Sequence, residues 1–180
     1  MEEATLHLRV DFNDDFTLIA GLVAAATAWL DGWSGILGRA LVTQTWRLYF
    51  DHGFPEQTIR LPLPPLIGVT SIQYVDINGA TQTVSPADYQ VLDGPRAAVR
   101  PVYGQIWPVT LAQARACWIE FECGYGAASE VPAAIKAAAL LMISHLYFHR
   151  DAVVGVEQRD SSTPLPLGVA ELLGPYRGRF

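Results

Sequence analysis

The sequence predicts an α+β fold: a helical bundle that bears an inserted small antiparallel β lobe and ends in a flexible C-terminal helix and tail. Apolar residues recur with a helical period near both ends of the chain. Between them the period changes to two at Leu41, and helix returns at Val131. We therefore expect one composite domain with an N-terminal helical part (1–40), a β lobe (41–126), a second bundle helix (127–152), and a linker, short helix and tail (153–180).

The 180-residue chain is acidic and rich in apolar residues. It has 12 Lys+Arg against 18 Asp+Glu, a net charge of −6, and 51% of its residues are hydrophobic. Only 17% are charged, whereas soluble domains average about 25%. This balance excludes a disordered chain, and the acidity argues against sequence-independent nucleic-acid binding, which requires cations that neutralise phosphates. So much apolar surface with so few charges indicates that partners cover part of it.

The first helix is expected over residues 16–30, with Asp14 or Asp15 as its N-cap. Between Phe16 and Gly38 the only charged residue is Asp31. A helix that packs on one side has a polar stripe on the opposite side, and this segment has almost none. We therefore expect the helix to be covered on more than one side, in part by another subunit.

The β lobe is expected to consist of short antiparallel strands. Asn78-Gly79 predicts a tight type I′ hairpin turn, because both central residues of that turn need a positive φ. Residues 61–66 contain three prolines and are expected to form an extended connector. Cys117 and Cys123 lie on one strand about 20 Å apart, too far for a disulfide, and should both be buried. The expected strands cover residues 45–50, 58–61, 71–77, 80–84, 89–92, 97–100 and 117–123.

Helix is expected again from Val131, with Pro132 in the first turn and Ser129 or Glu130 as its cap. Gly, Ser and Pro make residues 153–166 a mobile linker by composition, and a short helix should follow over 167–173. The start of the chain lacks the pattern of a signal peptide, which favours a cytosolic location. The most apolar run, 133–148, is shorter than the roughly 20 residues that cross a bilayer, so no membrane partner is expected.

No residue pattern predicts catalysis, a metal or a cofactor. His145 and His149 would share one helix face, as in a two-histidine metal site, but no glutamate stands between them. The acidic residues 11–15 lack the glycine and distal glutamate of a calcium loop. The glycine-containing segments lack the lysine of a phosphate-binding loop. We expect a protein that is not an enzyme.

Large aromatic residues outside the expected core are the candidate contact residues. Four of them are expected on loops or helix ends: Trp29, Trp33, Tyr103 and Trp107. Large aromatic side chains at such places often anchor interfaces. Ordinary packing in the core is the alternative explanation for these four residues. We interpret these four as inter-subunit or ring contacts. The tail combines apolar residues, aromatics and arginines that suit insertion into a groove of a partner protein. These residues are Leu172, Leu173, Tyr176, Arg177, Arg179 and Phe180. The alternative is that they form a frayed terminus.

The order of several motifs resembles the head–tail connector (adaptor) proteins of tailed phages and of phage-derived gene transfer agents. No motif is diagnostic alone, but together they extend over nearly the whole chain. They are LHLRVD at 6–11 before DDFTLI at 14–19, GRALVTQTWRL at 38–48, LPLPPL at 61–66 before VTSI at 69–72, PADY at 86–89, YGQIWP at 103–108, GYG at 124–126 with VPAAIK at 131–136, and PLGVAELL at 166–173 with PYR at 175–177.

The resemblance implies a virion structural protein made in the bacterial cytoplasm and located in the particle neck. Such a protein would form a ring of twelve copies that joins the portal protein to the stopper or next tail component and leaves a channel for DNA. It would have no catalytic residues or cofactors and no specific DNA binding; a net negative chain suits a conduit, because a basic lumen would hold the passing DNA. We expect residues 167–180 to dock on the portal or an adjacent ring. We expect the β lobe to face outward or toward the next tail component and to present Trp107 on its loop. The alternative is a non-enzymatic module whose β lobe binds a ligand or carbohydrate.

Overall fold

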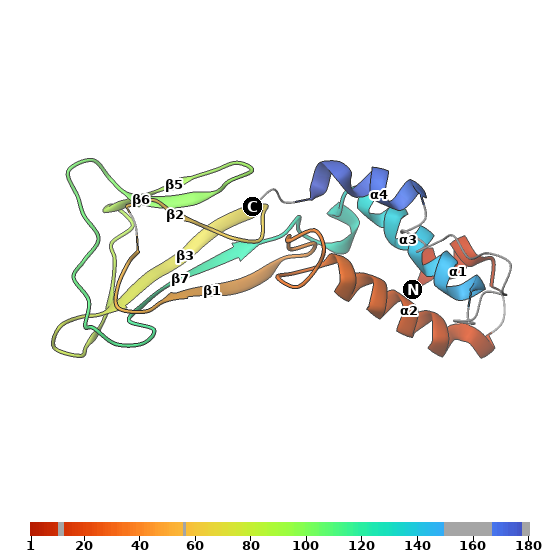
Figure 1. The fold of residues 1–180 in the computed structure, drawn as a ribbon, viewed down its shortest axis with the longest axis horizontal. Helices are drawn as coiled ribbons and strands as arrows, with labels where there is room; N and C mark the ends of the chain where they lie inside the picture. Colours follow the sequence, from red (N-terminus) through yellow and green to blue (C-terminus); the bar gives the residue numbers. More distant parts are fainter. Residues whose placement is uncertain (11–12, 56, 150–166, 178–180) are drawn as a thin grey trace, which may run out of the picture. The chain divides into compact units, whose positions relative to one another are not determined.

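The computed structural model describes residues 1–10, 13–55, 57–149 and 167–177 (Figure 1). The chain divides into two compact units. The helical unit comprises Met1–Gly38 and Val131–Phe180, and the β unit comprises Arg39–Glu130, so the β unit is inserted between two helical segments. The predicted α+β fold class is confirmed.

The helical unit is built around its longest helix, α3 (Ala133–Phe148). Three helices pack against α3: α1 (Glu2–Leu8), α2 (Phe16–Leu30) and α4 (Leu167–Leu173). The sequence predicted α2, α3 and α4 but not α1. Short 3-10 turns, Asn13–Asp15 and Gly174–Tyr176, precede α2 and follow α4. Each described helix falls short of the length and apolar character that a bilayer crossing requires.

The expected helix caps are not formed by side chains. Asp15 does occupy the N-cap position of α2, but its carboxylate accepts a hydrogen bond from the hydroxyl of Tyr147 on α3. Pro132 occupies the N-cap position of α3, and the Glu130 carboxylate instead accepts the backbone N–H of Ala127 at 2.7 Å. The Asp15 carboxylate therefore joins two helices, which a prediction from local sequence cannot foresee.

The β unit contains two antiparallel sheets around one apolar core. The four-stranded sheet has the order β1 (Gln44–Phe50), β7 (Cys117–Cys123), β3 (Leu66–Val75) and β4 (Thr81–Thr83). The three-stranded sheet has the order β2 (Ile59–Arg60), β6 (Ala98–Pro101) and β5 (Tyr89–Leu92). Ile59 and Val99 from the smaller sheet share a buried cluster with Ile72, Ile119 and Phe121 from the larger one. A 3-10 turn, Ala128–Glu130, ends the unit.

The hairpin between β3 and β4 differs from the predicted type I′ turn. β3 ends at Val75, and of the two predicted central residues only Gly79 has a positive φ, of 82°. The Asp76 carboxylate accepts the backbone N–H groups of Asn78 and Ala80 at 2.9 and 3.0 Å. These bonds organise a three-residue loop in which a glycine takes the left-handed position. The prediction of a two-residue turn was wrong because Asp76 begins the turn earlier than the Asn-Gly signal indicates.

The strand that carries both cysteines has the predicted alternation. Side chains of β7 alternate between the core and the outer face, and Cys117 and Cys123 are both buried and form no disulfide, as predicted. Burial raises the pKa of the Cys117 thiol to about 12, because a buried thiolate loses its hydration. The predicted linker, residues 153–166, lies outside the described residues.

Candidate assembly surfaces

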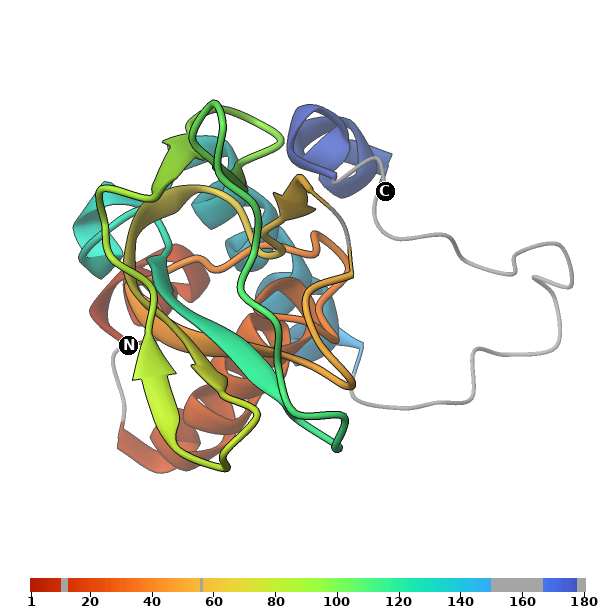
Figure 2. The ribbon, with the colours of Figure 1, turned by 90° about the vertical axis from the view of Figure 1, so that its left-hand side faces the viewer.

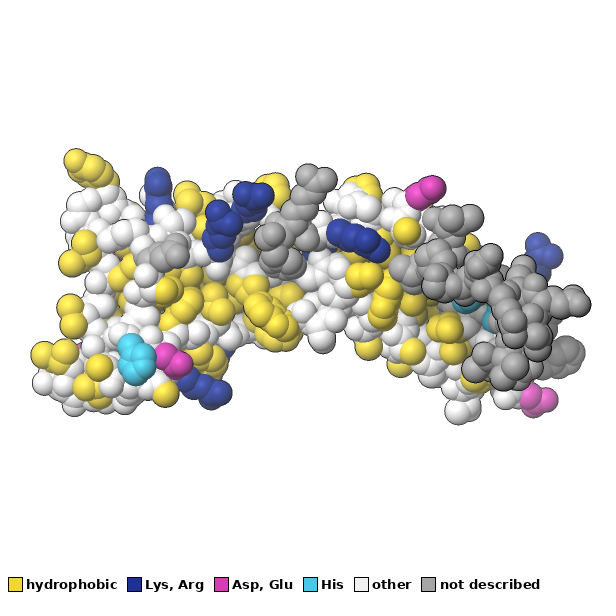
Figure 3. Space-filling model, in the orientation of Figure 1, with side chains coloured by type: hydrophobic (Ala, Val, Ile, Leu, Met, Phe, Trp, Pro, Cys, Tyr) yellow, Lys and Arg dark blue, Asp and Glu magenta, His cyan; other side chains and the backbone are white. Residues whose placement is uncertain are grey.

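The outward face of α2 carries no charged side chain. On its inner side Ile19, Ala26 and Leu30 are buried. The exposed residues opposite them are small or apolar: Thr17, Leu18, Ala20, Gly21, Ala24, Ala25 and Ala28. Within this chain α2 is thus buried on one side only, although a solvated helix face is normally polar or charged. In Figure 3 apolar groups are visible on the helical unit. We call this exposed set the α2 face.

The four predicted aromatic contact residues lie in different surroundings. Trp29 is half-buried near the end of α2, and Trp33, in the loop after it, is exposed. In the β unit Tyr103 is fully exposed. Trp107 is half-buried, because its ring stacks on Phe54 with centroids 4.7 Å apart.

The loop with Tyr103 and the β3–β4 turn each carry exposed apolar side chains at the same end of the β unit. Besides Tyr103, the side chains of Ile77, Ile106 and Val109 are 68%, 73% and 75% exposed. Figure 2 shows this end of the β unit facing the viewer, and Figure 3 shows yellow side chains along the same edge. Sequence reasoning missed the three aliphatic residues, although the lack of any charge over residues 101–114 was a readable signal.

The tail helix α4 is packed against α3 in its own chain. Val169 and Leu173, one helical turn apart, are fully buried. Leu172 and Tyr176 are half-buried, and Arg177 is exposed. Arg179 and Phe180 lie outside the described residues. The Leu173 side chain is therefore occupied within the chain in this conformation, and of the described residues predicted to dock only Arg177 is exposed.

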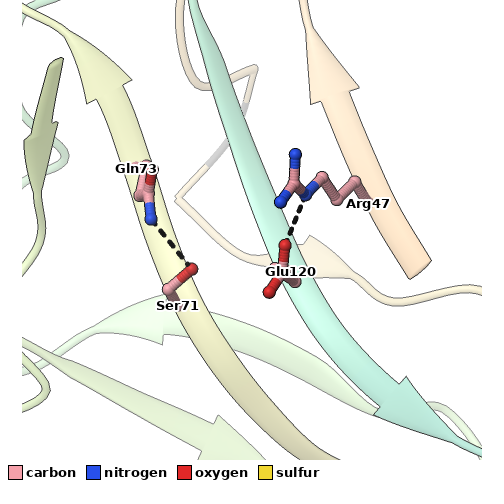
Figure 4. A network of polar contacts seen from close by, with 4 residues as sticks. All are labelled: Arg47, Ser71, Gln73 and Glu120. Atoms are coloured by element: carbon pink, nitrogen blue, oxygen red, sulfur yellow. Dashed lines mark hydrogen bonds and ion pairs between the residues drawn. The ribbon is translucent and has the colours of Figure 1, made fainter. Parts of the chain in front are cut away.

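The outer face of the four-stranded sheet carries a polar, internally paired group of side chains (Figure 4) and, beside it, the aromatic pair Tyr49 and Trp118. Arg47 on β1 forms an ion pair with its cross-strand neighbour Glu120 on β7, and this hydrogen bond raises the pKa of Arg47. On β3, Gln73 donates to the Ser71 hydroxyl at 3.3 Å. The Glu120 carboxylate therefore already has a charge-assisted hydrogen-bond partner on the neighbouring strand. The face thus resembles a solvated sheet surface rather than an acid–base site.

The two helix-end histidines are stacked on each other. The rings of His145 and His149 lie 4.4 Å apart between centroids, and Nδ1 of His149 is 2.9 Å from the carbonyl oxygen of His145. Among the described residues no group of three His, Cys, Asp or Glu side chains is placed to hold a metal ion. The described surface thus offers apolar contact areas, and these are the candidate functional features.

Comparison with known proteins identifies the fold. No family model matches the sequence, and no curated protein matches it. Among solved structures, the chain is similar to a chain of the virion of a native gene transfer agent (GTA) particle, with a TM-score of 0.76, 23% identity, and coverage of 98% of this chain and 87% of that one. A chain in the neck of an empty GTA particle computed with C6 symmetry has a TM-score of 0.75 and 23% identity, and the match covers 98% of this chain and 87% of that one. A chain in the neck of a native GTA particle computed with C12 symmetry has a TM-score of 0.70 and 22% identity, and the match covers 96% of this chain and 87% of that one. The chain therefore has the same fold as chains of GTA particles.

Proposed function

We propose that this chain is a structural protein of the neck of a tailed phage or gene transfer agent. It forms a ring that joins the portal protein to the stopper or next tail component and leaves a channel for DNA. The observation that carries the proposal is the likeness over 98% of the chain to a chain in the neck of a GTA particle. The C12 symmetry of the native neck supports a ring of twelve copies.

The α2 face supports assembly into a ring. A cyclic ring is built from heterologous contacts, in which one surface of each copy meets a different surface of the next. A long, uncharged, small-residue helix face suits such a contact, because it brings neither charge repulsion nor long side chains that must be ordered. In this proposal the neighbouring copy covers the α2 face.

The remaining features fit the same role. The tail from α4 onward docks on the portal or an adjacent ring, with Glu171 and Arg177 as exposed charged residues of its described part. The net charge of −6 disfavours strong binding of the DNA that passes through the channel. The described apolar surfaces serve assembly, and no enzymatic activity is proposed.

The test places a charge on the α2 face. Ala24→Glu puts a carboxylate in the middle of a face that is exposed in the single chain, so the free subunit should fold normally. Burying that unpaired carboxylate between copies should cost about 2–4 kcal/mol, or roughly 30- to 800-fold in affinity for each contact. Ala128→Glu is the matched control, because Ala128 is an exposed alanine on a 3-10 turn of the β unit.

Particles made with each variant are analysed by immunoblot for this chain and by electron microscopy for tails. We expect Ala24→Glu heads that lack both the chain and the tails, and normal particles from Ala128→Glu. Normal necks from Ala24→Glu would contradict a ring contact at α2. Absence of the chain from wild-type particles would contradict the proposed function itself.

A further inference from the structure

The two sheets of the β unit end in four edge strands, which differ in how well they are protected from pairing with another chain. The edges are β1 and β4 in the larger sheet and β2 and β5 in the smaller one. β4 has three residues, all exposed and polar, and β2 has two. Very short edge strands are a common protection against unwanted pairing. β1 and β5 are longer, with seven and four residues, and lack this protection.

Both longer edges present unpaired backbone. All seven residues of β1 pair in register with β7 without a bulge, and the strand contains no proline and only one charged residue, Arg47. β5 pairs with β6 alone. Within the described part of the chain, residues 45–50 and 89–92 make no backbone hydrogen bond outside their own sheets. An edge strand directs about half of its N–H and C=O groups away from its sheet, so each of these edges can accept a further extended strand.

The core side of both edges is incompletely covered within one chain. Trp46, Leu48 and Phe50 on β1 pack against the apolar core, as do Tyr89 and Val91 on β5, and all five side chains remain half-buried. A strand added to either edge brings its own alternate side chains onto the same core face. Both edges thus combine unpaired backbone with apolar side chains that a further strand would cover.

A second copy of this chain is the occupant that accounts for both edges. In Figure 1 β1 lies at the lower side of the β unit and β5 at the upper side. β5 contains no charged residue, so pairing it with β1 sets no like charges opposite each other. A strand of another protein would cover only one of the two edges. Two different surfaces on opposite sides are what a closed ring of identical copies requires.

We propose that β1 of one copy pairs with β5 of the neighbouring copy, so that backbone hydrogen bonds join their sheets across each subunit boundary of the ring. This inference deepens the proposed function and rests on it. Strand addition is a recurring mode of recognition, in which main-chain hydrogen bonds supply affinity and alternate side chains supply specificity. The half-buried apolar side chains of the two edges then share one continuous core face, and the closed ring leaves neither β1 nor β5 exposed.

The test links the two edges through outward-facing cysteines. Thr45 and Tyr49 on β1 and Gln90 on β5 alternate with the core-facing residues, and Thr45 and Tyr49 lie near the two ends of β1. Particles that contain Thr45→Cys/Gln90→Cys or Tyr49→Cys/Gln90→Cys are treated with a short bis-maleimide and analysed by denaturing gel electrophoresis. Thr45→Cys/Thr83→Cys is the matched control, because Thr83 is exposed on the β4 edge. The two native cysteines are buried and should not react.

We expect at least one Gln90 pair to convert most of the monomer band from particles into a ladder of multimers, because facing side chains of paired strands lie about 5 Å apart at Cβ. The isolated chain, the Thr83 pair and each single-cysteine variant should give no ladder. These changes replace outward side chains and leave the core intact, so the variants should fold and enter particles.

Particles that contain the chain but give no ladder with either Gln90 pair would overturn the edge pairing. A ladder from the Thr83 pair would overturn it as well, since β4 would then be the partner edge. Dimers from Thr45→Cys alone would mean that β1 pairs with itself in a symmetric contact, which also contradicts the proposal. Wild-type particles without this chain would instead contradict the proposed function.

Discussion

The attachment of α4 to α3 depends on two buried side chains, and Leu173→Ala tests it. Full burial of Val169 and Leu173 contributes about 1.5–3 kcal/mol each before the cost of ordering the segment is subtracted. A buried Leu→Ala change costs about 2–5 kcal/mol, which is comparable with the whole gain. With seven residues, α4 is too short to be helical without packing. We therefore expect α4 to detach in the variant while α1 to α3 remain folded.

Hydrogen exchange read by mass spectrometry on a peptide covering residues 167–177 measures this detachment. A loss of 2 kcal/mol or more corresponds to exchange that is at least about 30-fold faster in this peptide. Peptides from the middle of α3 should be unchanged. Leu172→Ala, at a half-buried position of the same helix, should have a much smaller effect. Unchanged exchange in Leu173→Ala would refute the reasoning, and so would a fall in melting temperature of about 4 °C or more, which would indicate global destabilisation instead.

Two further predictions concern the β unit. Thiol reagents at pH 8 should leave the folded chain unlabelled and should label two cysteines after denaturation. The reason is that Cys117 and Cys123 are buried and that the pKa of Cys117 is raised to about 12. Rapid labelling of the folded chain would contradict this prediction. Hydrogen bonds from Gln82 and from the backbone lower the pKa of Asp76 below 3.8, so its ionised form stabilises the fold above that pH and the contribution is lost as the pH falls through the lowered value. The melting temperature of Asp76→Ala should thus differ most from wild type at pH 7 and converge with it in acid; a constant difference would count against the turn network.

The elements that the sequence predicts well are those with long, regular patterns. The apolar period of α2 and the alternation of β7 each persist over several turns or pairs, so local pattern alone specifies them. α1 escaped prediction because only Ala4 and Leu8 of its seven residues are buried, which leaves almost no apolar period to read. The β3–β4 turn was mispredicted because the carboxylate of Asp76 competes with the Asn-Gly signal for control of the backbone.

The contact surfaces were predictable only in part. The lack of charge on α2 is visible in the sequence, and the structure adds which side of the helix is exposed. Tyr103 and Trp107 look equivalent in the sequence as loop aromatics. Only the fold brings Phe54, from a distant part of the chain, beneath Trp107 and leaves Tyr103 exposed. Exposure of one aromatic and packing of the other is a tertiary property.

Protection of the α2 face on assembly is the most direct measure of the central claim. Ala24→Cys places a small thiol on that face, and the two native cysteines of the chain are buried and should not react. Maleimide labelling of this thiol should be fast in the isolated chain and at least tenfold slower in intact particles, with Ala128→Cys reporting that the reagent reaches the neck. Equal labelling of Ala24→Cys in the isolated chain and in particles would mean that no neighbouring subunit covers α2, and the account of the ring would be wrong.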